Sequence, residues 1–204
     1  MYAVTFKRKR NNIRSRAVRA AASLLIICIA LSAYTFAADC RGVRSKVLRL
    51  RIIANSDMLC DQEAKTAVRD RILSMSADIF SDCRDLEQAA EKARQMIGSF
   101  TEAAADVLRE RGFDYGVSAG ICREVFGTRS YGSVTLPAGE YTALRITLGE
   151  GGGHNWWCVM FPMLCVPSSG NGGADVFNSG ERRVTELDGY DLRFKCAELF
   201  IKSE

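Results

Sequence analysis

The sequence predicts an α+β fold in which two long helices pack on one face of a mostly antiparallel sheet, behind an N-terminal membrane or signal segment. Three observations lead to this prediction: an uncharged apolar run over residues 20–38, a helical repeat of apolar residues over 64–107, and strand-like patterns on both sides of that repeat. One strand, two helices and at least three further strands, in this order, are typical of helices that cover one face of an antiparallel sheet.

The N-terminal segment has the pattern of a signal or anchor. The 19 residues from Ala20 to Ala38 contain no charge, Gly or Pro, and they are long enough to cross the hydrocarbon core of a bilayer. A basic flank before an apolar run keeps the N-terminus inside and directs the rest across the membrane. We therefore expect a leader over residues 1–38 and a single exported α+β domain over residues 39–204, with cleavage of the leader left open. The leader contains no acid and seven bases: Lys7, Lys9, Arg8, Arg10, Arg14, Arg16 and Arg19.

The charge of the chain is unevenly distributed. The formal net charge is +4, but seven of the 28 basic residues lie in the leader. Residues 39–204 contain the remaining 21 basic residues and all 24 acidic residues, so the expected domain has a net charge of about −3. Because no basic stripe interleaved with aromatic residues remains to bind phosphates, we expect no nucleic-acid partner.

The cysteines do not form a metal-binding pattern. The chain has eight cysteines, of which only Cys28 lies in the apolar run, and it has one histidine. No Cys-x-x-Cys spacing occurs, so a structural zinc site lacks its usual ligands. Disulfides and buried free thiols are both compatible with this usage.

The first half of the domain reads as one strand and two helices. Residues 47–54 alternate in the period-2 pattern of a half-buried strand, and Ser56 or Asp57 is expected to cap the helix that follows. The second helix begins after Cys83, runs for about 25 residues and ends near Gly112, which is placed as a C-terminal cap. The apolar stripes of the two helices are formed by Ala64, Val68, Ile72, Met75 and Ile79, and by Leu86, Ala90, Ala93, Ile97, Phe100, Ala104 and Val107.

The second half reads as strands joined by turns. Residues 136–139 form a Pro-Ala-Gly turn, and the wholly apolar segment from Trp156 to Phe161 is expected to be a central strand. The other expected elements are strands over 115–126 and 141–148, a flexible loop over 149–155, a flexible surface loop over 168–174 and a short helix over 192–202.

Two sequence blocks resemble the stage II sporulation protein R family. The first is Arg49-Leu-Arg-Ile-Ile-Ala-Asn-Ser-Asp57, followed by Asp61-Gln62, Lys65 and Val68-Arg-Asp70. The second runs from Leu136-Pro-Ala-Gly-Glu-Tyr141 and Ala143-Leu-Arg145 to Gly153-His-Asn-Trp-Trp-Cys-Val159, Phe161-Pro162 and Leu164-Cys165. The likeness spans about residues 44–166, and residues 168–204 lie outside it.

The resemblance implies an intercellular signal and no catalyst. Members of this family are exported from the forespore to the space between forespore and mother cell, secreted or anchored by their N-terminus. There they activate a membrane-embedded aspartic protease of the mother cell, the peptidase that removes the pro-sequence of sigma-E. For this chain the resemblance implies that protease as partner, membrane contact through residues 20–38 if the leader is uncleaved, and no catalytic residue, metal or cofactor.

A hydrolase is the alternative, because His154 lies four residues before Cys158. On one strand these two positions are separated by about 13 Å at 3.3 Å per residue, too far for a thiolate and its base. Cys60, Cys122 or Cys165 could still approach His154 through folding, so a cell-wall or peptide hydrolase stays open. A membrane-tethered structural protein of the septum is a third class.

Recognition residues are expected where the loop over 149–155 meets the end of the first strand. Neither the Gly-rich loop nor the acids at 57, 61 and 63 have the spacing of a phosphate or calcium loop. Loops on a rigid scaffold commonly carry recognition, and an exposed Trp is a frequent interface anchor. The predicted partner-binding residues are Asn55, Asp57, His154, Asn155, Trp156 and Trp157.

Overall fold

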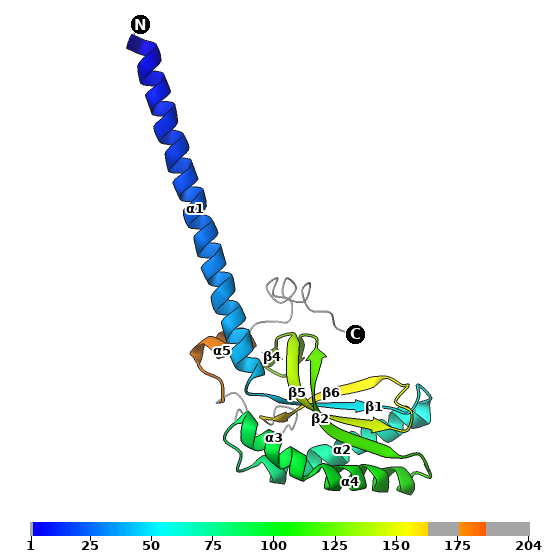
Figure 1. The fold of residues 1–204 in the computed structure, drawn as a ribbon. Coiled ribbons are helices and arrows are strands. Elements are labelled where there is room, and N and C mark those ends of the chain that lie inside the picture. Colours follow the sequence, from blue (N-terminus) through cyan, green and yellow to red (C-terminus); the bar gives the residue numbers. More distant parts are fainter. Residues whose placement is uncertain (1, 163–175, 187–204) are drawn as a thin grey trace. The chain divides into compact units, whose positions relative to one another are not determined.

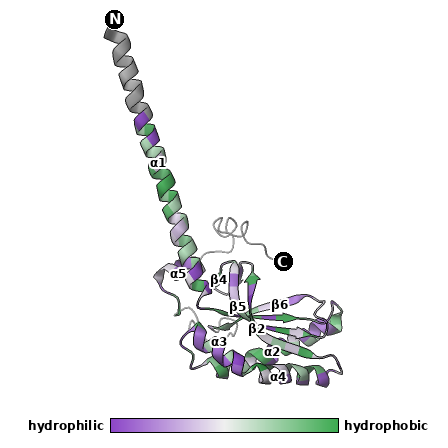
Figure 2. Ribbon diagram, in the orientation of Figure 1, coloured by the Kyte–Doolittle hydropathy of each residue, from purple (hydrophilic) through white to green (hydrophobic). Residues whose placement is uncertain are grey.

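The computed structural model describes residues 2–162 and 176–186. The chain divides into two compact units, Met1–Asp39 and Cys40–Glu204. Helix α1 (Tyr2–Arg44) forms the first unit and continues into the second (Figure 1). Its Arg16–Arg44 part is long and apolar enough to cross a membrane, and Figure 2 shows its hydrophobic band in green. The predicted N-terminal apolar segment is therefore a helix.

The second unit contains a four-stranded mixed sheet in the order β2-β5-β1-β6. The central pair β1 and β5 is parallel, and the outer pairs β2–β5 and β1–β6 are antiparallel. The α+β prediction is confirmed, but the prediction of a central last strand is wrong. Among the described residues β6 is an edge strand, and its second half, from Cys158 to Phe161, is apolar because both of its faces are buried. The strands are β1 (Leu48–Ile53), β2 (Val117–Phe126), β5 (Gly139–Leu148) and β6 (Asn155–Phe161).

Three helices cover one face of the sheet: α2 (Leu59–Phe80), α3 (Leu86–Gln95) and α4 (Ile97–Glu110) (Figure 1). The second long helix of the prediction is therefore two helices, divided at Met96, whose φ and ψ are −95° and 5°. The backbone N–H of Met96 still bonds to Lys92 and its carbonyl still accepts from Phe100, so the chain turns with little loss of hydrogen bonding. The apolar stripe continues across this break, which is why its spacing predicts one helix.

One of the two predicted helix caps agrees with the structure, and the other does not. Gly112 has a φ of 79° and follows α4, and the N–H of Phe113 closes the helix by bonding to the carbonyl of Leu108. The predicted cap at Ser56 or Asp57 is wrong, because α2 begins after Met58 with no side-chain cap. Asp57 instead bonds to a residue in a distant loop, described below.

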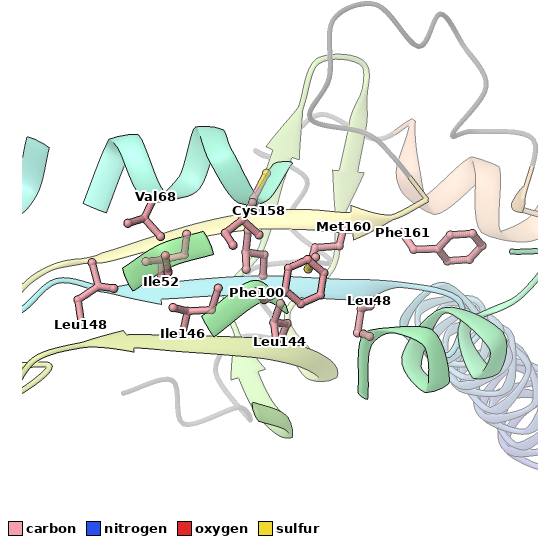
Figure 3. Close-up of a cluster of buried hydrophobic side chains, with 14 of the residues drawn as sticks. Leu48, Ile52, Val68, Phe100, Leu144, Ile146, Leu148, Cys158, Met160 and Phe161 are labelled. Carbon is pink, nitrogen blue, oxygen red and sulfur yellow. The ribbon is translucent and has the colours of Figure 1, made fainter. Parts of the chain in front are cut away.

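Two apolar clusters lie on the two faces of the sheet. The larger one packs alternate strand residues, including Ile52 and Ile146, against Val68 of α2 and Phe100 of α4 (Figure 3). The smaller one, on the opposite face, includes Tyr141 of β5 and three elements that the sequence analysis missed: β3 (Arg129–Tyr131), β4 (Val134–Leu136) and the segment before α5 (Ser179–Thr185). The loop predicted over 168–174 and the helix predicted over 192–202 lie outside the described residues.

Helix α5 begins with a capping motif that is recognisable in the sequence. Asn178 accepts bonds from the N–H groups of Gly180 and Glu181, and the Glu181 carboxylate accepts from the N–H of Asn178. This reciprocal capping box has the sequence form Asn-x-x-Glu, which marks a helix start. Lys46 also pairs with Glu181 at 2.7 Å, so the short helix is fixed to the chain just before β1.

Candidate functional site

The loop after β1 and the loop between β5 and β6 lie against each other at one end of the sheet. The backbone N–H groups of Gly152 and Gly153 donate to the carbonyls of Asn55 and Ala54, both at 3.0 Å. The Asn55 side chain accepts a third bond, from the N–H of Glu150, also at 3.0 Å. We call residues 54–58 and 149–155 the sheet-end loops. They belong to the two separate sequence blocks, which the fold brings together.

Glycine in the second loop permits close approach. Gly149 has a φ of 55°, a conformation that residues with a side chain rarely adopt. At Gly153 an added Cβ would lie 2.3 Å from the carbonyl oxygen of Ser56. The loop over 149–155 was expected to be flexible from its composition, but backbone hydrogen bonds tether it. The glycines are there because the two loops touch.

Asp57 and His154 join the two loops at the surface. The Asp57 carboxylate accepts a hydrogen bond from the backbone N–H of His154 at 2.7 Å and also pairs with ring Nδ1. These bonds from His154 hold the pKa of Asp57 below its usual range. Both side chains stay exposed, 56% for Asp57 and 79% for His154. The pair therefore presents a fixed carboxylate and an imidazole to solvent.

A buried carboxylate supports this pair from below. Asp61 of α2 is 3% exposed and accepts hydrogen bonds from Asn55 at 2.9 Å, Ser56 at 2.6 Å and Tyr115 at 2.9 Å. Burial alone raises the pKa of Asp61, but the bonds from Ser56, Asn55 and Tyr115 outweigh it and lower the pKa. Asp61 thus ties the loop after β1 to α2 and to the segment before β2.

Lys65 supports the second loop from the same helix. Its Nζ donates to the backbone carbonyl of His154 at 2.9 Å and to the side chain of Gln62. Burial lowers the pKa of Lys65, partly opposed by the charge of Asp57. His154 is therefore held by Asp57 on its N–H side and by Lys65 on its carbonyl side.

The two tryptophans of β6 have different surroundings. Trp157 is half-buried, with the Arg51 guanidinium 4.6 Å from its ring and Phe126 at 4.8 Å. Arg51 also donates to Asn155 at 2.9 Å. Trp156 is 37% exposed, and the Arg69 guanidinium lies 4.3 Å from its ring. Trp156 is thus the more accessible of the two.

The structure brings four of the predicted recognition residues, Asn55, Asp57, His154 and Asn155, to one end of the sheet, and Trp156 and Trp157 continue from them along β6. Asp61 and Lys65 were not predicted to support them. Their role could have been inferred from the sequence, since residues 61, 65, 68 and 72 share one stripe of α2. Asp61 and Lys65 therefore place a carboxylate and an amine at positions that face the core.

The hydrolase alternative gains no support from Cys158 or Cys122; Cys60 is an exposed free thiol at the start of α2, and Cys165 lies outside the described residues. Cys158 is buried and disulfide-bonded, so it offers no thiolate. Cys122 lies on β2, three strands from β6 and so about 14 Å away at 4.8 Å per strand. Burial and Glu124 raise the pKa of the Cys122 thiol. The imidazole of His154 pairs with Asp57, and the described residues include no cluster of three metal-ligating side chains.

Comparisons with known proteins agree with the two sequence blocks. The model of the family described as Stage II sporulation protein R (spore_II_R) matches residues 44–171. A curated relative from Bacillus subtilis (strain 168), "Stage II sporulation protein R", is 36% identical over 132 residues. That match covers 65% of this chain and 59% of the relative, so the chain spans less than two thirds of the relative's length. No solved structure matches the chain. The chain belongs to the stage II sporulation protein R family.

Proposed function

We propose that this chain is an exported signal of sporulation that activates a membrane-embedded aspartic protease of the mother cell. The protease then removes the pro-sequence of sigma-E. The observation that carries the proposal is the convergence of both family blocks on the sheet-end loops, where a hydrogen-bonded scaffold holds exposed polar side chains. Rigidly held loops of this kind are the usual place for recognition.

The chemistry of the sheet-end loops favours binding over catalysis. The Asp57–His154 pair has the base and the orienting carboxylate of a hydrolytic site, but the described cysteine nearest in sequence, Cys158, is in a disulfide. An imidazole, a carboxylate and an exposed Trp in one region are instead suited to a protein interface.

The N-terminal helix supports export of the domain, because its apolar part comes after a run of bases. We expect a reporter fused after Glu204 to be active only on the outer side of the forespore membrane. A paired reporter, such as alkaline phosphatase against a cytoplasmic fluorescent protein, measures this directly. Cytoplasmic activity of the fusion would contradict both export and the signalling role.

Substitutions in the sheet-end loops should weaken activation. We expect His154→Ala, Asn155→Ala and Trp156→Ala each to weaken binding by about 2 kcal/mol, roughly thirty-fold in affinity, as is usual for interface hot spots. The measurement is the processed fraction of pro-sigma-E in a host that co-expresses the chain, the protease and the substrate.

The matched control is Val125→Ala, which trims an exposed apolar side chain on β2, at the other edge of the sheet. It should leave processing unchanged. Normal processing by all three loop variants, at normal levels of exported protein, would place the interface elsewhere.

Cysteine variants separate the signal from the hydrolase. We expect Cys60→Ser and Cys122→Ser to activate normally, because a signal needs no thiolate. Cys158→Ser should lower stability, since it removes a disulfide and leaves a hydroxyl in an apolar core. Loss of activation by Cys60→Ser or Cys122→Ser, with fold and export intact, would favour a nucleophilic cysteine.

A further inference from the structure

A groove of about 440 Å³ lies beside strand β6. Its walls are the part of α2 around Arg69 and Leu73, the β3–β4 turn at Tyr131, and Trp156 and Trp157 of β6. The two tryptophans point to opposite faces of the sheet, so a groove lined by both runs along the edge of the strand. The groove lies next to the sheet-end loops, because β6 begins at Asn155.

The aromatic walls of the groove are held in place. The ring of Trp157 contacts both Arg51 and Phe126, and that of Trp156 lies beside the Arg69 guanidinium. Arg69 in turn pairs with Asp70 at 2.6 Å on the rim. Cation–π contacts and edge-on ring packing restrain side chains that would otherwise change rotamer. A ligand therefore meets a largely preformed apolar surface.

A buried cation lies directly behind the groove. Arg49 is fully buried, and it donates from Nη2 to the Tyr131 hydroxyl at 2.8 Å and from Nε to the Cys158 carbonyl at 3.2 Å. Tyr131 and Cys158 both line the groove. The guanidinium also lies 4.3 Å from the ring of Phe126 and 5.1 Å from that of Tyr141.

This cation lacks a counter-charge in the described part of the chain. No described carboxylate lies within 4.0 Å of Arg49, and its Nη1 has no hydrogen-bond partner. Buried charged groups are normally paired, so an unpaired guanidinium nitrogen is costly. On the rim Arg69 and Asp70 form an ion pair, so the charged side chains that line the groove balance each other, and Arg49 behind them has no carboxylate of its own.

We propose that the groove binds a segment of a partner protein in which a carboxylate side chain lies next to an apolar one. The apolar side chain packs on Trp156 and Trp157, and the carboxylate is attracted by the uncompensated charge of Arg49. This inference rests on the proposed function, since the partner that it describes is the extracytoplasmic part of the receptor protease.

The test uses intrinsic fluorescence, because the chain has two tryptophans and both line the groove. The full chain in mild detergent micelles is titrated with the peptide acetyl-Leu-Glu-Leu-amide and with its Gln and Lys counterparts. We expect a saturable change with the Glu peptide and at least a tenfold weaker response to the Gln peptide, since the neutral amide is not attracted by the positive charge behind the groove. The Lys peptide should give none.

Variants assign the response to the groove. Leu73→Ala removes an apolar side chain from its wall and should weaken binding of the Glu peptide several-fold, while Val125→Ala on β2 should leave it unchanged. Equal binding of the Glu and Gln peptides, or no response to either, would overturn the proposal. So would a response to vesicles of phosphatidylglycerol in the absence of any response to the Glu peptide, which would indicate a lipid headgroup site.

Protease activation, measured on the same preparations, keeps the two proposals apart. Normal activation without peptide binding would overturn the groove proposal and leave the signalling role intact. Peptide binding without activation would support the groove as an acidic-peptide site and count against the signalling role.

Discussion

Replacing Asp61 by alanine should lower the free energy of unfolding by about 3 kcal/mol, because three hydrogen-bond donors lose a charged acceptor in a buried place. The donors are Asn55, Ser56 and Tyr115, from two separate segments of the chain. Since Asn55 also accepts the N–H of Glu150, loss of Asp61 should loosen both sheet-end loops. Urea unfolding of the full chain in detergent, followed by tryptophan fluorescence, measures the change.

Glu63→Ala is the matched control for this change. It removes the same charge from the same turn of α2, but Glu63 is exposed. We expect its effect to stay within about 0.5 kcal/mol. Equal losses for the two variants would show that Asp61 acts only through its charge near the helix start.

The stabilisation by Asp61 should also depend on pH. Its pKa in the folded chain lies below the ordinary value of 3.8, so the stabilisation is present above about pH 4 and is lost as the pH falls through the folded pKa. The stability difference between the natural chain and Asp61→Asn should therefore shrink in acid. A difference that stays constant from pH 7 to pH 3 would contradict this account of the carboxylate.

Replacing Gly153 by alanine should cost about 2 kcal/mol, because the new Cβ would lie 2.3 Å from the carbonyl oxygen of Ser56 and 3.0 Å from the Cβ of Ala54. The backbone has to move apart, which breaks the bond from Gly153 to the carbonyl of Ala54. Because His154 follows directly, this variant should reduce activation as well as stability. Urea unfolding and the co-expression assay measure the two effects.

Gly98→Ala is the matched control, and it should raise stability where Gly153→Ala lowers it. Gly98 lies within α4, and an added Cβ there meets nothing within 4 Å. Alanine is favoured over glycine inside a helix by about 0.5–1 kcal/mol, so this variant should be slightly more stable than the natural chain. If Gly153→Ala were as well tolerated as Gly98→Ala, the close contact of the two loops would not exist in solution.

Local patterns predict much of this fold, and they fail where the outcome depends on distant residues. Alternation predicts β1, and the four-three stripe predicts α2, because both follow from the backbone period. The break at Met96 escapes prediction because the apolar stripe runs on through it. The edge position of β6 is not predictable from its apolar pattern. β3, β4 and Phe177 cover one face of the sheet there, so β6 is as apolar as a central strand would be.

The same division applies to the candidate site. The segment after β1 and the one before β6 are each predictable as loops from their polar residues and, in the second, its glycines, but their contact depends on a strand order that local patterns do not give. The bond between Asp57 and His154 is not predictable from local patterns, since the two residues are 97 positions apart. The unpaired Nη1 of Arg49 is a further case, because alternation assigns Arg49 to the exposed face, whereas Tyr131, Phe126 and Tyr141 pack against its guanidinium.

The central claim is that the exported domain activates the receptor protease directly. The decisive measurement is reconstitution of the protease in vesicles that enclose its pro-sigma substrate. The chain, carried in detergent-free nanodiscs, is then added to the outside of these vesicles. We predict processing that rises and saturates with the concentration of the chain, and that falls for His154→Ala but not for Val125→Ala. Processing at the same rate without the chain, or cleavage of the substrate by the chain in the absence of the protease, would contradict the account.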